Sequence, residues 1–127
     1  QIWKTATSVG NPFDSTEEPN TFLEQLTYQE VGKYCLAYAC TYRTLLRSTQ
    51  GLAYVCYVCT HRSARLKDRA LNRGIVTFMS NGQEIPRSTW HLTLAHELGH
   101  SMGSAHDYPE EAVKYPECGY QGDKSFL

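Results

Sequence analysis

The sequence predicts one domain that combines α-helices with β-strands. Three short apolar runs bounded by turn residues predict strands, and two segments with apolar side chains on one helical face predict helices. With 127 residues, the chain is long enough for a single modest core. It contains no internal repeat, no low-complexity segment and no sign of a second domain.

The first elements are a short strand and a helix. Ile2 to Ser8 is short and β-branched enough for a strand, which Gly10-Asn11-Pro12 then ends. Asn20 or Thr21 is a suitable cap for a helix whose apolar face carries three residues, Phe22, Leu23 and Leu26.

The middle of the chain predicts further strands. Cys35 to Tyr42 is a compact apolar run that indicates a buried strand. Leu52 to Val58 is a second such run, either a strand or a packed extended loop. Arg62 to Arg73 carries five basic residues and is typical of a solvated loop or short helix. Gly74 to Met79 then predicts a strand that ends at the turn residues Asn81-Gly82.

The last predicted element is a helix from about Trp90 to Met102. Ser88 or Thr89 can cap its start, and Gly103 ends it. The segment from His96 to Asp107 has the pattern HExxHxxGxxHD. Six matched positions at about 5% each make a chance match on the order of one in a million.

This pattern predicts a catalytic zinc site. His96 and His100, four residues apart on a helix, project from one face and can reach one Zn²⁺ at ~2.0–2.1 Å. Gly103 allows the turn that brings His106 to the same ion. Three nitrogens leave the fourth zinc position open for water, as catalytic sites do. Glu97, about 100° around the helix, is placed to act on that water as a general base.

Two other interpretations of the three histidines are possible, and neither uses the open fourth position or Glu97. They could be hydrogen-bonded core residues, or they could form a closed structural zinc site, which would need a fourth protein ligand. Leu94, Leu98 and Met102 recur every four residues on the opposite side of the helix. We expect that face to be buried in the core and to hold the site on a rigid element.

Composition and cysteine content limit the partners and the compartment. The formal net charge of −1 gives no indication of a nucleic-acid partner. No apolar run approaches a membrane span, so we expect no direct membrane contact from this segment. The five cysteines favour disulfides in an oxidising compartment, although Cys56 and Cys59 have the CxxC spacing of zinc or redox motifs.

The motif resembles that of a known family. HExxHxxGxxHD is the zinc signature of the metzincins, and Asp107 after the last ligand resembles the adamalysin (ADAM) group. Four other segments are similar to the Kuzbanian (α-secretase) branch: Asn11-Pro12-Phe13, Tyr34 to Tyr38, Gly51 to Val55 and Leu71 to Ile75. The resemblance runs from about residue 11 to 107 and continues more weakly to the end.

The resemblance implies an α/β/α metzincin domain with a mixed, mostly parallel sheet and the active-site helix beneath the cleft. It implies that Gly74 to Ser80 is the edge strand that binds the substrate, with Gly74, Ile75, Val76, Thr77 and Phe78 in contact with it. It further implies a zinc endopeptidase on the extracellular or luminal side of a single-pass membrane protein. Such an enzyme sheds the ectodomains of membrane proteins, Notch-type receptors among them.

The same resemblance leads us to expect that residues 1–127 are part of a catalytic domain. An upstream strand and helix and a downstream Met-turn would lie outside them. By resemblance, Cys35 pairs upstream of Gln1, and Cys59 and Cys118 pair downstream of Leu127. A bridge between Cys40 and Cys56 is a further possible pairing.

One alternative function belongs to a different class. The chain could be a metzincin fold kept as a binding module after the loss of catalysis. The glutamate and all three histidines are intact, which favours an active enzyme.

Overall fold

The computed structural model describes residues 11, 13, 15–30, 34–59 and 68–106. The strand expected at Ile2 to Ser8, the basic residues 62–67, Asp107 and Cys118 lie outside these residues. Within the described part of the chain, no helix has both the length and the apolar character needed to cross a membrane.

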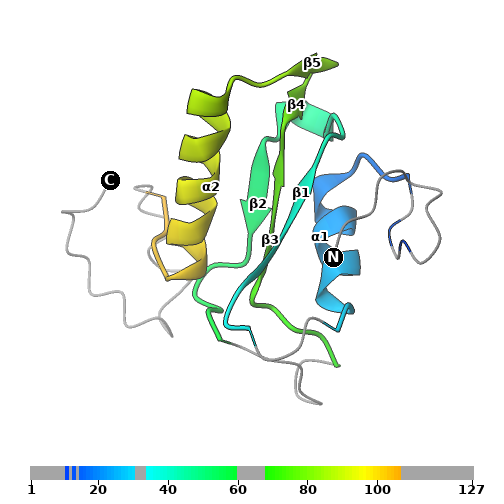
Figure 1. Ribbon diagram of the computed structural model, residues 1–127. Coiled ribbons are helices and arrows are strands. Elements are labelled where there is room, and N and C mark those ends of the chain that lie inside the picture. Colours follow the sequence, from blue (N-terminus) through cyan, green and yellow to red (C-terminus); the bar gives the residue numbers. More distant parts are fainter. Residues whose placement is uncertain (1–10, 12, 14, 31–33, 60–67, 107–127) are drawn as a thin grey trace.

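The described residues form a sheet between two helices. In chain order the elements are α1 (Pro19–Thr27), β1 (Ala37–Thr41), the 3₁₀ helix η1 (Leu46–Ser48), β2 (Gly51–Ala53), β3 (Arg73–Thr77), β4 (Met79–Ser80), β5 (Gln83–Glu84) and α2 (Arg87–Ser101). The main sheet has the order β1-β3-β2. Strand β1 is parallel to β3 and β2 is antiparallel to it. Figure 1 shows α1 and α2 on opposite faces of this sheet, so the α/β fold with a mixed sheet is confirmed.

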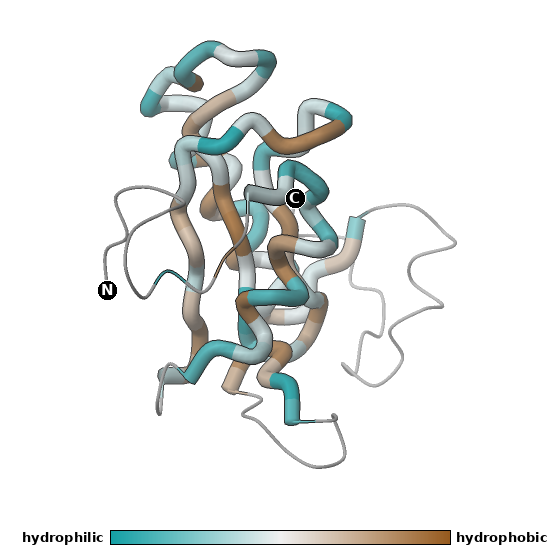
Figure 2. The backbone as a smooth tube through the Cα atoms, turned by 90° about the vertical axis from the view of Figure 1, so that its right-hand side faces the viewer, coloured by the Kyte–Doolittle hydropathy of each residue, from teal (hydrophilic) through white to brown (hydrophobic). Residues whose placement is uncertain are grey.

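Helix α1 covers the main hydrophobic core. It begins at Pro19, one residue before the expected cap, and proline suits the first helical turn because its missing N–H has no intrahelical partner there. The core cluster consists of Phe13, Phe22, Leu23, Leu26, Leu45 and Ile75. In Figure 2, which views the molecule from the side, hydrophobic stretches follow the strands and the helices. The apolar face that the sequence predicted for this helix is therefore buried against the sheet.

The strand register assigns the two faces of the sheet. Ile75 lies opposite Ala39 on β1 and Leu52 on β2, and all three pack into the core beneath α1. Alternate residues of a strand point to opposite faces. Gly51 and Val76, which form the next cross-strand pair, therefore face α2.

The prediction that Gly74 to Ser80 forms the edge of the sheet is wrong. Strand β3 contains residues 74–77 of the expected edge strand, but it is the central strand and is buried along its whole length. Burial of Ile75 and Val76 on opposite faces is typical of a central strand, which needs neighbours on both sides. Among the described strands β1 and β2 lie at the two edges of the sheet, and β2 includes the start of the Leu52–Val58 run.

A small hairpin follows β3. Strands β4 and β5 pair in an antiparallel register through Ser80 and Gln83. The expected turn at Asn81-Gly82 connects them, and both residues have positive φ (49° and 75°). Two such residues form the tight turn that suits a two-residue hairpin. Chain reversal here leads directly into α2.

Helix α2 differs from its prediction at its start and in its buried face. It begins at Arg87 after Pro86, so neither Ser88 nor Thr89 caps it. Its buried residues are Glu97, His100 and Ser101. The Leu94, Leu98 and Met102 face is not in the core: the leucines are half-buried and Met102 is 67% exposed. On the opposing sheet face, the missing side chain of Gly51 leaves room for Glu97. The space above Gly74 is filled by Tyr38, whose hydroxyl hydrogen-bonds Ser101.

The cysteines do not pair as the resemblance implied. Cys35 and Cys59 form a disulfide with each other, so neither needs a partner elsewhere. Cys40 is free and exposed, while Cys56 is disulfide-bonded, which excludes a Cys40–Cys56 bridge. The loop after β2 turns back under the end of α2 and brings Cys59 beside Cys35. The backbone N–H of Cys59 donates to the Cys35 carbonyl at 2.7 Å.

That loop also caps the end of α2. The last carbonyls of a helix have no intrahelical partners. Here the N–H of Cys56 donates to the carbonyl of His100 at 2.9 Å, and the N–H of Val58 donates to that of Ser101 at 3.2 Å. The disulfide-linked loop therefore holds the end of the helix that carries the predicted metal ligands.

Candidate metal centre and active site

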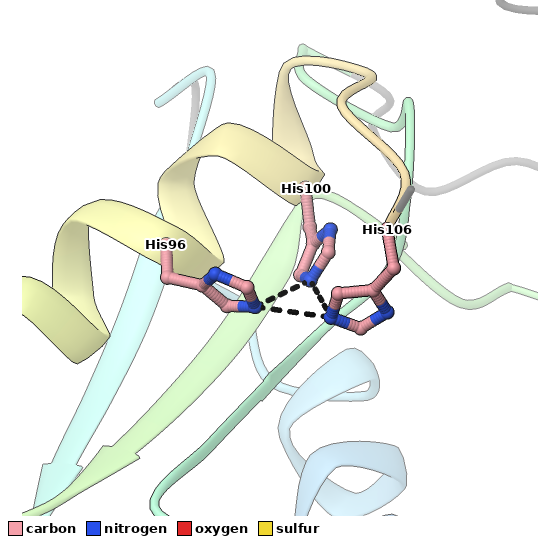
Figure 3. A group of neighbouring side chains, drawn as sticks. All are labelled: His96, His100 and His106. Carbon is pink, nitrogen blue, oxygen red and sulfur yellow. Dashed lines mark hydrogen bonds between the residues drawn. The ribbon is translucent and has the colours of Figure 1, made fainter. Parts of the chain in front are cut away.

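Three histidine side chains converge at the end of α2 (Figure 3). The Nε2 atoms of His96 and His100 lie 2.9 Å apart, and each lies 3.1 Å from Nε2 of His106. Ligands at ~2.0–2.1 Å from one tetrahedral ion are about 3.3 Å from each other. The three nitrogens therefore have nearly the spacing that a common Zn²⁺ ion requires.

The turn after the helix brings the third histidine to the other two. Gly103 has φ of 109°, a value that side chains disfavour, and its N–H donates to the carbonyl of His100 at 2.9 Å. Ser104, next along the turn, donates its N–H to the carbonyl of Gly99 at 2.9 Å. The chain thus reverses directly after the helix, as the HxxGxxH spacing predicted.

A backbone carbonyl fixes the orientation of His100. Its Nδ1 lies 2.6 Å from the carbonyl oxygen of Ser104, which can only accept a hydrogen bond. The proton must therefore be on Nδ1, and the lone pair is on Nε2, which faces His96 and His106. Metal-binding histidines in proteins are commonly oriented in this way. The sequence contains no signal for this role of Ser104, because it is a main-chain contact.

Burial and charge favour the neutral form of the His96 imidazole. His100 is buried, whereas His106 is exposed. Partial burial lowers the pKa of His96, and the neighbouring His100 and His106 lower it further. A neutral imidazole is the form that binds metal.

Glu97 is placed apart from the three nitrogens, on the side of α2 that faces the sheet. Its side chain is buried, with 6% exposure. Burial raises the pKa of Glu97 to about 7. A carboxylate with a pKa near neutrality is well suited to accept and return a proton.

A cleft of about 680 Å³ brings these groups together. One wall comes from the segment that leads into β2 and from β2 itself, and the other comes from α2. Its lining residues are Ser48, Thr49, Gln50, Gly51, Leu52, Ala53, Val55, Leu92, Thr93, His96, Glu97, His100 and His106. Residues 74–78, which the sequence assigned to substrate binding, do not line it.

Tyr38 connects the far strand of the sheet to the active-site helix. Its ring lies where a side chain at Gly74 would be, and its hydroxyl shares a hydrogen bond of 2.7 Å with Ser101. Burial raises the pKa of Tyr38 to about 12, so the hydroxyl stays protonated. Sequence reasoning missed this contact because its partners are 63 residues apart.

The donor set fits zinc. Three imidazole nitrogens with an open side toward a cleft match catalytic zinc sites, whereas magnesium and calcium prefer oxygen ligands. In the described part of the chain, these histidines are the one group of three or more histidine, cysteine or acidic residues close enough to hold an ion.

Comparison with known proteins identifies the family. The sequence model described as "Metallo-peptidase family M12B Reprolysin-like" matches residues 3–126. The chain belongs to this metallopeptidase family. Its membership confirms the resemblance that HExxHxxGxxHD indicated, and it confirms the fold class.

Three relatives of this M12B chain share about a third of its residues. It is 35% identical over 123 residues to "Disintegrin and metalloproteinase domain-containing protein 10 homolog" of Caenorhabditis elegans, covering 85% of this chain and 13% of the relative. It is 36% identical over 117 residues to "Disintegrin and metalloproteinase domain-containing protein 10" of Xenopus laevis, covering 84% of this chain and 16% of the relative. With the Homo sapiens protein of the same name it is 37% identical over 101 residues, covering 72% of this chain and 14% of the relative. The chain therefore spans only a small part of the length of these relatives.

Proposed function

We propose that this chain carries the active site of a zinc-dependent endopeptidase. The observation that supports this most strongly is the convergence of three histidine Nε2 atoms in the cleft that Glu97 also lines. Membership of a metallopeptidase family agrees with it.

In this proposal the three histidines bind the metal and Glu97 transfers the proton. His96, His100 and His106 hold Zn²⁺, which when bound lowers the pKa of water and polarises the scissile carbonyl. Glu97 accepts a proton on its carboxylate from the attacking water and later gives it to the amine that leaves. Its buried position excludes competing solvent and keeps its pKa near neutrality.

Removal and return of the metal test this function. We expect a chelator to abolish peptide cleavage by the protein that contains this chain, and one equivalent of Zn²⁺ to restore it. A binding module with the same fold would take up zinc without cleaving peptides. Zinc uptake with no turnover across a broad peptide library would therefore favour the binding module over the enzyme.

We further propose that the substrate pairs with the outer edge of β2. Gln50 accepts a hydrogen bond from Thr77, and Tyr54 donates one to Arg73, so the main-chain groups of residues 50 and 54 point toward β3. Main-chain groups alternate in direction along an antiparallel strand. Those of Gly51 and Ala53 therefore point away from β3, along the wall of the cleft. An extended peptide can add to this edge as a further strand.

Substitution of Ala53 by proline tests the edge directly. Proline removes the outward N–H, and edge strands tolerate it where no sheet bond is lost. Loss of one hydrogen bond of about 1 kcal/mol predicts roughly a five- to tenfold fall in kcat/KM. Ala53→Gly, which keeps the N–H, is the matched control. Equal kcat/KM for the proline variant and the wild type, with zinc retained in both, would contradict pairing at β2.

From the resemblance to the Kuzbanian branch, we propose that the natural substrates are ectodomains of membrane proteins. Notch-type receptors are the candidates that the resemblance suggests, and the active site would then lie on the extracellular or luminal side of a membrane. Release of a Notch-type ectodomain from cells that express the protein, but not from cells that express its Glu97→Gln variant, is expected. Equal release in both would count against this substrate class.

A further inference from the structure

Gly51 lies where the wall of the cleft meets the proposed general base. We propose that Gly51 is a positioning residue whose missing side chain provides the space in which Glu97 is held. A Cβ atom at residue 51 would lie 2.6 Å from Cγ, 2.7 Å from Oε1 and 2.9 Å from Cδ of Glu97. Real Cβ atoms essentially never approach other heavy atoms so closely, so a side chain at residue 51 would force the end of the Glu97 side chain to shift.

The backbone at this position does not itself require glycine. Gly82 and Gly103 have positive φ, the conformation that favours glycine, whereas Gly51 is not among the positive-φ glycines. Gly51 instead lies in a regular strand, paired with Val76. An alanine there would be conformationally acceptable, so it is the close contact with Glu97 that favours glycine at this position.

The register explains why this contact forms. Gly51 is on the face of the sheet that α2 covers, and Glu97 is on the buried face of α2. A methyl group at residue 51 would displace the carboxylate from β2 into the cleft that the three histidines share. The strand wall thus keeps the carboxylate beside the histidine cluster.

Two other glycines differ from Gly51 in what a side chain there would meet. A Cβ at Gly74 would meet the ring of Tyr38, which is a structural contact outside the cleft lining. A Cβ at Gly99, in the helix between two of the histidines, would meet only Ser104 at 3.8 Å, an ordinary contact distance. Gly99→Ala is therefore a matched control, since it makes the same chemical change near the site without a clash.

The inference rests on the proposed function, and the test separates the two. Gly51→Ala and Gly99→Ala are made in the protein that contains this chain. Both are expected to keep one zinc ion. A displacement of the general base by about 1 Å predicts roughly a 10²-fold fall in kcat for Gly51→Ala. KM should change by less than about threefold, because the main-chain groups that face the substrate remain. The control should keep the kcat of the wild type.

A readout independent of activity is the position of the carboxylate. Crystal structures of the zinc-loaded wild type and Gly51→Ala are expected to show Glu97 moved away from β2 in the variant. A Glu97 that stays in place would overturn the inference, whatever the activity of the wild type. An unchanged kcat, a rise in KM at constant kcat, or a loss of zinc would each overturn it too. Absence of cleavage by the wild type would instead refute the proposed function.

Discussion

Replacing Glu97 with glutamine is expected to abolish peptide cleavage while leaving zinc bound. Glutamine keeps nearly the same size and hydrogen-bonding reach, but its amide does not accept and return a proton at neutral pH. Loss of a general base lowers the rate by about 10²–10⁴. Because the three histidines supply the metal-binding nitrogens, the zinc content should be unchanged. Metal analysis and kcat for a peptide substrate, measured on the same preparations, test both expectations.

The matched comparison for this variant is Glu84→Gln. Glu84 is an exposed residue of the β4–β5 hairpin. The substitution Glu84→Gln therefore makes the same chemical change away from the cleft. Turnover by Glu84→Gln should equal that of the wild type. Cleavage by Glu97→Gln within about tenfold of the wild type would remove Glu97 from the role of general base.

Replacing His100 with alanine is expected to remove metal, activity and stability together. His100 is the buried member of the cluster, and its Nδ1 is the partner of the Ser104 carbonyl. The variant loses one of three ligands and the contact that holds the turn leading to His106. Zinc stabilises the folded protein by about 2.7 kcal/mol when free metal is about 100 times its Kd, and this contribution should disappear.

Thermal denaturation with and without zinc measures that loss. The melting temperature of the wild type should rise when zinc is added, and that of His100→Ala should not. His91→Ala is the control, because His91 is exposed on the same helix and contacts the Trp90 ring instead of the cluster. Stoichiometric zinc in His100→Ala would show that this imidazole is not a ligand.

The contrast between these two variants separates binding from chemistry. A protein that loses turnover but keeps zinc has lost a proton carrier, and one that loses both has lost a ligand. The two residues are three positions apart on α2, so a general disturbance of the helix would affect them alike. Different outcomes for them would therefore support distinct roles.

The sequence by itself determined the local features of this protein. The spacing of His96, Glu97, His100 and His106 is a property of one helix and the turn after it, and both follow from short-range periodicity and a glycine. The apolar face of α1 and the turn at Asn81-Gly82 were predictable for the same reason. Their geometry depends on residues fewer than about ten positions apart, so a linear pattern specifies them.

Only the tertiary structure decided which elements lie next to each other. The lateral order β1-β3-β2 placed Gly51 and Ala53, and not residues 74–78, along the cleft. The folding of the loop after β2 joined Cys35 to Cys59. Contacts with Gly51 and with the Tyr38 hydroxyl place Glu97 and Ser101 on the buried side of α2. Each outcome depends on contacts between segments far apart in the chain, and a strand carries no local mark of the neighbour with which it will pair.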